Sequence, residues 1–169
     1  LSSAKRQLDL EYAKVTNVLN LEWLTCVGEK GAWFTETGLK RQEDFYKNES
    51  DTSVKQVVIV CDALRYEVAK ELMQELAKEK HIATLDAYQA MLPTETKYCK
   101  PALLPHHLLE LNGTDMMVDG TLLTTTEQRT AHLGKYREGA ICTRYEDVMN
   151  GDAQSMRELF KRSLVYIFY

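Results

Sequence analysis

The chain has 169 residues, of which 44% are hydrophobic and 27% are charged, and its formal net charge at pH 7 is -4. This length and composition are typical of one globular domain, or of one domain with a helical appendage. The negative net charge argues against a general nucleic-acid-coating surface but is compatible with a local basic cleft. No apolar run reaches membrane-spanning length, and the four cysteines show no metal-binding spacing, so we expect a cytoplasmic protein with free thiols and no membrane partner.

The first fifty residues have the pattern of helices. Apolar residues recur at roughly helical spacing over 1–27, and a second helix is predicted at Gly38–Lys47. The polar stretch 48–53 follows, so we place a domain boundary there, between a helical segment (1–50) and an α/β domain (55–169). No part of the helical segment has catalytic spacing, and we expect it to pack on the sheet or on preceding sequence.

An unbroken apolar run, Val57–Cys61, leads directly into residues at helical spacing. A short unbroken run is typical of a strand covered on both faces in a parallel sheet, so we expect a central strand. The residues that lie four apart after it are Leu64, Val68, Leu72 and Leu76. This spacing predicts a helix at Ala63–Lys78 that covers one face of the sheet and buries Leu72.

Strands and helices continue to alternate along the rest of the chain. A second strand is predicted at Ile82–Ala90. The later elements are a helix at Tyr98–Leu104, a strand at Met116–Val118 with a turn at Asp119–Gly120, a helix at Thr125–Tyr136 capped by Thr126, a strand at Ala140–Thr143, helices at Tyr145–Asn150 and Asp152–Lys161, and a strand at Leu164–Tyr169. This alternation predicts a layered α/β sheet.

Polar residues follow the first two predicted strands. The carboxyl ends of strands form the ligand crevice of open α/β sheets, so Asp62 is a candidate site residue, with a helix N-cap as the alternative. Thr94 and Thr96 follow the second strand, and capping of the next helix is the alternative for both.

Three basic residues lie close to these candidates. Arg65 lies one helical turn beyond Asp62, where its guanidinium can pair with a phosphate or with a neighbouring carboxylate. Lys97 and Lys100 flank the threonine segment and can add positive charge for an anionic substrate. Surface solvation is the alternative for both lysines, and we favour it for Lys100.

Several short motifs occur in a fixed order. They are Asp-Ala-Leu-Arg-Tyr-Glu (62–67), Leu-Pro-Thr-Glu-Thr-Lys (92–97), Ala-Leu-Leu-Pro (102–105), Val-Asp-Gly (118–120) with Arg129, Tyr-Glu-Asp (145–147) and Leu-Val-Tyr-Ile-Phe (164–168). The series, over roughly 56–169, resembles the PglZ domain, an alkaline phosphatase superfamily domain of bacterial BREX phage-defence systems. In this series, Asp119 is adequately explained as a turn residue and Arg129 as a helix-surface residue.

The resemblance implies a layered αβα sandwich of alkaline phosphatase-like fold and a metal-dependent phosphohydrolase or phosphodiesterase in bacteriophage defence. Asp62 matches the first metal ligand, and Thr96 matches the nucleophile and a further metal ligand, with Thr94 as the alternative nucleophile. Arg65 and Lys97 are the expected substrate-binding residues. The implied cofactors are divalent metal ions, zinc or another transition metal. The implied partners are a phosphate-ester or nucleic-acid-derived substrate and other phage-defence proteins.

One Asp and one Thr do not hold a dinuclear metal centre, and the resemblance places further Asp and His ligands after Tyr169. We therefore expect an incomplete fragment of the domain, inactive on its own and possessing only half of the metal site. The rival hypothesis is a non-catalytic scaffold or interaction module of a phage-defence complex. A phosphoglycerate mutase-like or phosphopentomutase-like enzyme on the same fold is a third reading.

Overall fold

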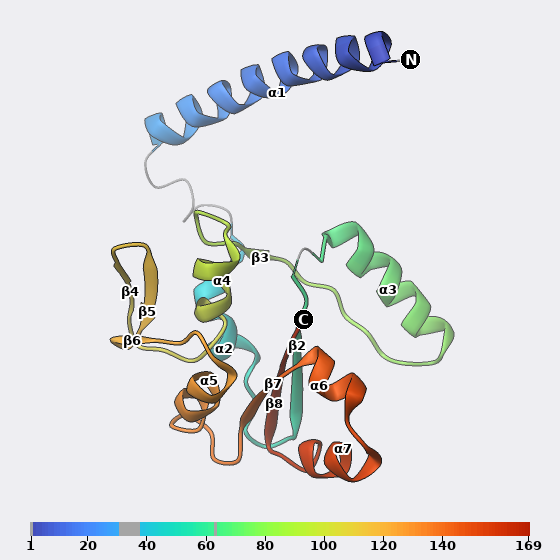
Figure 1. Cartoon of the computed structure of the whole chain (residues 1–169), viewed down its shortest axis with the longest axis vertical. Helices are drawn as coiled ribbons and strands as arrows, with labels where there is room; N and C mark the ends of the chain where they lie inside the picture. Colours follow the sequence, from blue (N-terminus) through green and yellow to red (C-terminus); the bar gives the residue numbers. More distant parts are fainter. Residues whose placement is uncertain (1, 31–37, 63) are drawn as a thin grey trace. The chain divides into compact units, whose positions relative to one another are not determined.

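A computed structural model of the chain describes residues 2–30, 38–62 and 64–169. Its contacts divide the chain into two units, Leu1–Gly38 and Leu39–Tyr169. The described part of the first unit is chiefly one helix, α1 (Ser2–Lys30), which confirms the predicted helix and runs past its predicted end (Figure 1). Among the described residues, no helix is both long and apolar enough to cross a membrane.

The second unit mixes strands and helices, as the alternation in the sequence predicts. Its strands are β1 (Lys40–Arg41), β2 (Gln56–Val60), β3 (Tyr88–Gln89), β4 (Leu109–Asn112), β5 (Asp115–Val118), β6 (Thr121–Leu122), β7 (Ile141–Arg144) and β8 (Leu164–Phe168). Its helices are the 3-10 turn η2 (Gln42–Asp44), α2 (Phe45–Glu49), α3 (Tyr66–Lys78), α4 (Thr96–Ala102), α5 (Thr126–Leu133), α6 (Tyr145–Asn150) and α7 (Ala153–Leu159).

The main sheet is parallel, with the strand order β2-β8-β7 (Figure 1). β8 is its centre, and all five residues of β8 are buried, as expected for an unbroken apolar strand with neighbours on both edges. Phe168 is in register with Val60 of β2 and with Arg144 of β7. The carboxyl ends of the three strands therefore form one level rim.

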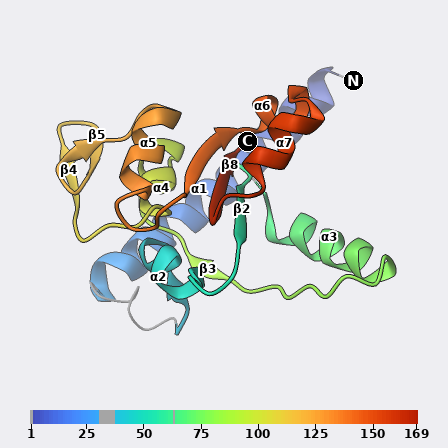
Figure 2. The same cartoon turned by 90° about the horizontal axis from the view of Figure 1, so that it is seen from below.

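The core lies on the sheet face formed by Leu164, Tyr166 and Phe168. These side chains cluster with buried residues from the segment after α4, from β5 and from α5, and Phe45 and Tyr46 of the η2–α2 region pack against them. Figure 2 shows α2 on this side of the sheet and α6 and α7 on the other.

The structure contradicts the prediction that Val57–Cys61 is a central strand. Among the described strands, β2 pairs with β8 alone and so lies at an edge, where Val57 is 48% exposed and Ile59 is 60% exposed. A central position needs another strand along the free edge. The next predicted strand, Ile82–Ala90, forms regular structure only at β3, which pairs with β1.

The helix predicted at Ala63–Lys78 is present as α3, which ends at Lys78 as expected but begins at Tyr66. Ala63 itself lies outside the described residues. The prediction that this helix covers the sheet is wrong, because Leu72 is 51% exposed and α3 has no fully buried residue. Among the described strands, none pairs with the free edge of β2, so a sheet surface that the apolar stripe of α3 could cover is not formed there.

The region around residues 38–53 also differs from its prediction. The single helix expected at Gly38–Lys47 is replaced by β1, η2 and α2. The predicted division into 1–50 and 55–169 stays a prediction. In the structure, contacts group residues 39–53 with the α/β unit.

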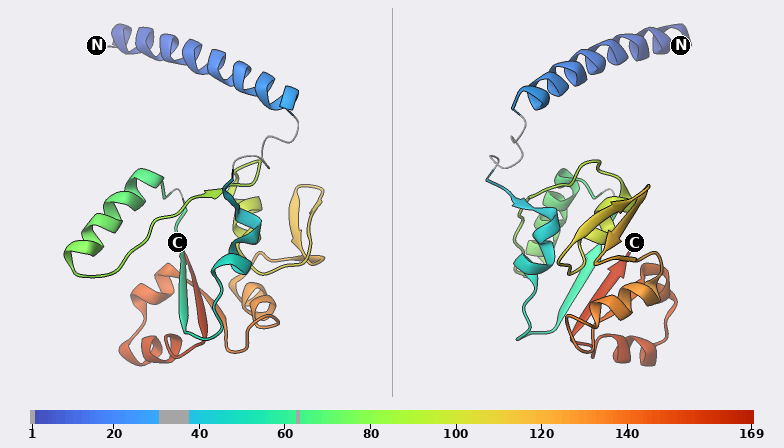
Figure 3. Two further views of the ribbon diagram at one scale, coloured as in Figure 1. Left: turned by 180° about the vertical axis from the view of Figure 1, so that it is seen from behind. Right: turned by 90° about the vertical axis from the view of Figure 1, so that its left-hand side faces the viewer.

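Short turns and caps define the second half of the unit. Asp119 and Gly120 have φ angles of 48° and 74°, which suits the two-residue turn that joins β5 to β6 and confirms the predicted turn. The hairpin partner β4, which was not predicted, places the β4–β5 hairpin beside α4 (Figure 3). Helix α5 is shorter than predicted, and its cap is Thr125 rather than Thr126, because Thr125 and Gln128 form a reciprocal capping box.

Candidate functional site

The two strongest candidates from the sequence meet at the carboxyl-end rim of the sheet. Asp62 lies two residues beyond the end of β2, and Thr96 is the first residue of α4. The Thr96 hydroxyl donates a hydrogen bond to Asp62 Oδ2 at 3.0 Å. The carboxyl ends of parallel strands are where ligand sites gather in α/β sheets, and Asp62 follows such a strand as predicted. The strand expected before Thr96 forms only β3, which does not belong to this sheet.

Neither side chain occupies the capping position that was its structural alternative. The N-cap of α3 is Arg65, three residues beyond Asp62, and the N-cap of α4 is Glu95, which precedes Thr96. The Thr96 hydroxyl is directed to a carboxylate instead. Thr94 is exposed in the segment before α4.

Lys100 belongs to the same site, contrary to the prediction that it is a solvated surface residue. Its side chain is only 21% exposed, and its Nζ lies 3.5 Å from Asp62 Oδ2. The same ammonium group donates to the main-chain oxygen of Tyr169 at 3.3 Å. Lys100 lies one helical turn beyond Thr96, which brings both side chains to one face of α4. This i, i+4 spacing was the signal that sequence reasoning overlooked.

The two predicted substrate-binding residues are placed differently. Arg65 is exposed at the start of α3. Lys97 lies 3.5 Å from Glu95 Oε2 and 4.6 Å from the ring centroid of Tyr98. The hydrogen bond with Tyr98 and, to a smaller extent, the negative charge of Glu95 raise the pKa of the Lys97 ammonium group. The structure thus joins Asp62, Thr96 and Lys100, whereas the roles of Arg65 and Lys97 stay predictions.

Gln42 holds the segment that carries Thr96, and sequence reasoning gave it no role. Its Oε1 accepts from the N–H of Met91, and its Nε2 donates to the carbonyl of Cys99, both at 3.1 Å. The Gln42 side chain therefore forms hydrogen bonds with the main chain on both sides of Thr96, at Met91 and at Cys99. Both Gln42 contacts cross more than forty-five residues of sequence, so no local pattern could reveal them.

The Asp62 carboxylate and the Thr96 hydroxyl are oxygen donors that suit a divalent metal ion. Two donors are fewer than the three protein ligands of an ordinary catalytic metal site. Across residues 2–30, 38–62 and 64–169, no group of three or more His, Cys, Asp or Glu side chains is arranged to hold a metal. The pair therefore fits part of a metal site and needs further ligands.

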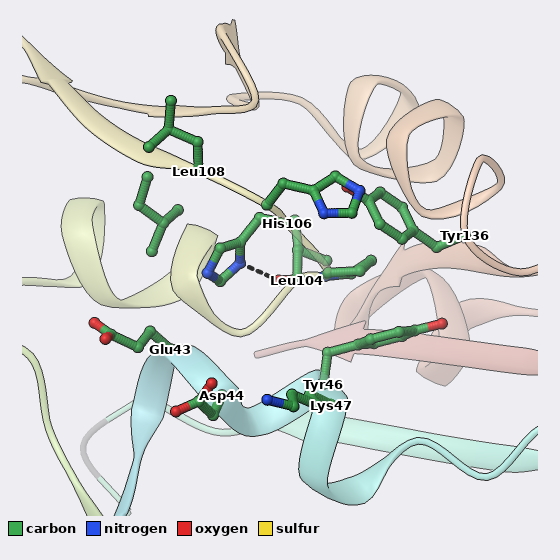
Figure 4. A pocket seen from close by; sticks show the side chains of 11 residues that line it. Glu43, Asp44, Tyr46, Lys47, Leu104, His106, Leu108 and Tyr136 are labelled. Atoms are coloured by element: carbon green, nitrogen blue, oxygen red, sulfur yellow. Dashed lines mark hydrogen bonds between the residues drawn. The ribbon is translucent and has the colours of Figure 1, made fainter.

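A cavity of about 500 Å³ lies apart from the Asp62–Thr96 pair. Figure 4 shows Glu43, Asp44 and Lys47 from the η2–α2 region facing His106 and Tyr136. The Nδ1 atom of His106 lies 2.7 Å from the carbonyl oxygen of Leu104. The ring centroid of the adjacent His107 lies 5.6 Å from the ring centroid of Tyr136.

Asp119 connects residues that line this cavity, so its role goes beyond forming a turn. Its Oδ1 accepts from the N–H groups of His107 and Leu108 at 2.9 Å, and its Oδ2 accepts from the Tyr136 hydroxyl at 2.5 Å. Desolvation raises the pKa of the Asp119 carboxyl, but these hydrogen bonds outweigh it and lower that pKa to about 2. Desolvation and the same carboxylate raise the pKa of Tyr136 to about 12. The Val-Asp-Gly motif thus has a structural explanation.

Comparison with known proteins identifies the family. The model of the BREX system PglZ alkaline phosphatase-like domain matches residues 43–169. The alkaline phosphatase-like protein PglZ of Bacillus cereus (strain H3081.97) is 30% identical over 161 residues, which are 90% of this chain and 19% of that protein. The alkaline phosphatase-like protein BrxZ of Escherichia coli O9:H4 (strain HS) is 33% identical over 143 residues, 78% of this chain and 16% of that protein.

No solved structure gives a significant match to the chain. The chain spans less than a fifth of the length of either curated relative. The family model, by contrast, matches about three quarters of the chain and includes Asp62, Thr96 and Lys100. On these matches, the chain belongs to the family of BREX system PglZ alkaline phosphatase-like domains.

Proposed function

We propose that this chain supplies the nucleophile and the first metal ligand of a metal-dependent phosphodiesterase that acts in bacteriophage defence. The observation that carries the proposal is the hydrogen bond of 3.0 Å between the Thr96 hydroxyl and Asp62 Oδ2 at the carboxyl-end rim. It pairs a potential nucleophile with a carboxylate in the location where ligands bind in α/β sheets. Membership of an alkaline phosphatase-like family supports hydrolysis of a phosphate ester.

Each residue of the site has its own role in the proposed reaction. Thr96 Oγ1 forms a bond to phosphorus as the bond from phosphorus to the leaving alcohol oxygen breaks, and the Thr96 proton goes to that oxygen. Water then hydrolyses the bond between phosphorus and Thr96, which restores the hydroxyl and releases the phosphate monoester. Asp62 accepts the hydroxyl hydrogen bond and orients the nucleophile. The Lys100 ammonium, 3.5 Å from Asp62 Oδ2, adds positive charge for an anionic substrate. A divalent metal held by Asp62, Thr96 and further ligands would lower the pKa of the hydroxyl and polarise the ester.

Several broader features belong to the same proposal. The substrate is a phosphodiester or another nucleic-acid-derived phosphate ester, and zinc or another transition metal is the cofactor. Other phage-defence proteins are the partners, in the cytoplasm. In the complete domain, the sheet is the middle layer of an αβα sandwich, and Arg65 and Lys97 contribute to substrate binding.

The test compares two chains. One is the chain of residues 1–169, and the other, called the long form below, is a chain of this protein that extends to the full length of the curated relatives. Each is incubated with a chromogenic phosphodiester, with and without added zinc, manganese or magnesium. We expect turnover by the long form only when metal is present, and none by residues 1–169, because the residues that the structure describes hold no group of three metal-binding side chains.

Metal-dependent turnover by residues 1–169 would show that the assignment of ligands is wrong. A long form that is inert with every metal and ester would favour the scaffold hypothesis over the enzyme. A metal-dependent enzyme that turns over only sugar phosphates would favour the mutase-like hypothesis instead.

A further inference from the structure

A cleft of about 610 Å³ lies at the carboxyl ends of β7 and β8. Its walls come from α4, the start of α5, the start of α6, and the residues at the end of β8. Its volume is in the range of sites for drug-sized or nucleotide-sized ligands. Its basic lining residues are Lys100, Arg129 and Arg144, and its acidic ones are Glu127, Glu146 and Asp147.

The cleft adjoins the Asp62–Thr96 pair, and Lys100 is common to both. Lys100 lines the cleft, and its ammonium group lies 3.5 Å from Asp62 Oδ2. Tyr169 also lines the cleft, and its N–H donates to the carbonyl of Val60, two residues before Asp62, at 3.0 Å. A ligand that extends from Thr96 along this rim therefore enters the cleft.

Arg129 is a preorganised cation in the cleft wall. Its Nε donates to the carbonyl of Leu123 at 3.1 Å, and its guanidinium carbon lies 4.8 Å from the ring centroid of Phe168. In the part of the chain that the structure describes, no carboxylate forms an ion pair with Arg129. Burial lowers the pKa of its guanidinium, yet an arginine stays charged at neutral pH. A half-buried cation without a carboxylate is stabilised by an anion bound from outside.

The other two cations of the cleft are already paired. Arg144 binds both carboxylate oxygens of Asp147, through Nε and Nη2 at 3.2 Å each. Lys100 pairs with Asp62. Arg129 is thus the basic lining group whose charge is not taken up by a carboxylate among the described residues, and Arg144 is its natural control.

We propose that Arg129 binds a second phosphate of the substrate while the reacting phosphate lies at Thr96. The inference rests on the proposed function and narrows its substrate class to phosphate esters with at least one further phosphate. An oligonucleotide, in which successive phosphates are separated by a sugar, and a nucleoside diphosphate, in which they are adjacent, both have this chemistry. A guanidinium fork suits the oxygens of either.

Binding is measured by titration calorimetry on the long form in the presence of a chelator, so that no turnover occurs. The oligonucleotide arm compares thymidine 3′,5′-bisphosphate with thymidine 3′-monophosphate, and the anhydride arm compares ADP with AMP. We expect the second phosphate to tighten binding about tenfold or more in at least one arm, since a charge-assisted hydrogen bond is worth that much. The arm that shows the preference identifies the spacing of the two phosphates.

Arg129→Gln is expected to abolish this preference, and Arg144→Gln, which removes an equal charge from the same cleft, is expected to retain it. Thermal unfolding of each variant checks the fold. Should Arg129→Gln unfold, Arg129→Lys replaces it, with a preference reduced at least threefold because the planar fork is lost. No preference in either arm for the unsubstituted protein, or an equal loss in the Arg129 and Arg144 variants, would overturn the inference. Metal-dependent turnover that survives such a result leaves the proposed function standing.

Discussion

Replacement of Thr96 by alanine is expected to lower metal-dependent phosphodiester turnover by the long form by about 10³-fold or more, as removal of a covalent nucleophile does in other hydrolases. In the proposed mechanism the Thr96 hydroxyl, which donates to the Asp62 carboxylate, supplies the oxygen that attacks phosphorus. Initial rates are measured with a chromogenic diester at saturating metal.

Asp62→Asn is expected to lower the same rate and to raise the metal concentration needed for half-maximal turnover.

Thr94→Ala is the matched control, because Thr94 is the alternative nucleophile and lies two residues away in the same segment. We expect its turnover to stay within about threefold of the unsubstituted protein, as for a residue outside the chemistry. A large loss in the Thr94 variant with near-normal rates in the Thr96 variant would exchange the two assignments. Unchanged turnover in both would move the nucleophile elsewhere.

Replacement of Arg137 by methionine is expected to lower the free energy of unfolding by roughly 3–5 kcal/mol. Arg137 is only 7% exposed. Its guanidinium donates to the carbonyls of Asp51 at 2.9 Å and Ser163 at 2.7 Å, to the carbonyl of Val54, and to Gln56 Oε1 at 3.0 Å. These acceptors lie at or just before the amino ends of β2 and β8. Methionine would leave the carbonyls of Asp51 and Val54 without this donor, while Gln56 Oε1 and the Ser163 carbonyl keep only the N–H groups of Asp51 and Gln56.

Urea denaturation of residues 1–169, followed by circular dichroism, measures this change. Arg162→Met is the control, since Arg162 is an exposed arginine of the same unit and its loss is expected to cost under about 0.5 kcal/mol. Arg137→Lys keeps the charge but not the fork, so it should fall between the two. An Arg137→Met variant as stable as the Arg162 control would show that these hydrogen bonds contribute nothing net.

Local signals in the sequence were sufficient where local chemistry decides the structure. The turn at Asp119–Gly120 follows from two residues that tolerate positive φ, and the helix at Tyr145–Asn150 was predicted with its observed ends. The unbroken run at Leu164–Phe168 is a buried strand because it has neighbours on both edges. The similar run at Val57–Cys61 could not be distinguished from it, since apolar residues do not reveal which strand is central.

The candidate site was only partly predictable for a related reason. Asp62 and Thr96 were identified from their places after strands and from the family resemblance, and the structure joins them although they are 34 residues apart. Lys100 was expected to be a solvated surface residue, Arg129 was explained as a helix-surface residue, and Gln42 was given no role, because the contacts of all three depend on the fold. In the case of Arg129, the decisive fact is the lack of a carboxylate partner among the described residues, which no sequence pattern reports.

In the proposed enzyme, Asp62 and Thr96 bind the same divalent metal ion. Anomalous diffraction from crystals of the long form grown with zinc tests it most directly, because the peak locates the metal independently of any assay. We expect a peak about 2.0–2.2 Å from an Asp62 carboxylate oxygen, with the Thr96 hydroxyl oxygen as a second ligand and the remaining ligands from outside residues 1–169. A fully occupied zinc site whose ligands include neither Asp62 nor Thr96 would contradict it.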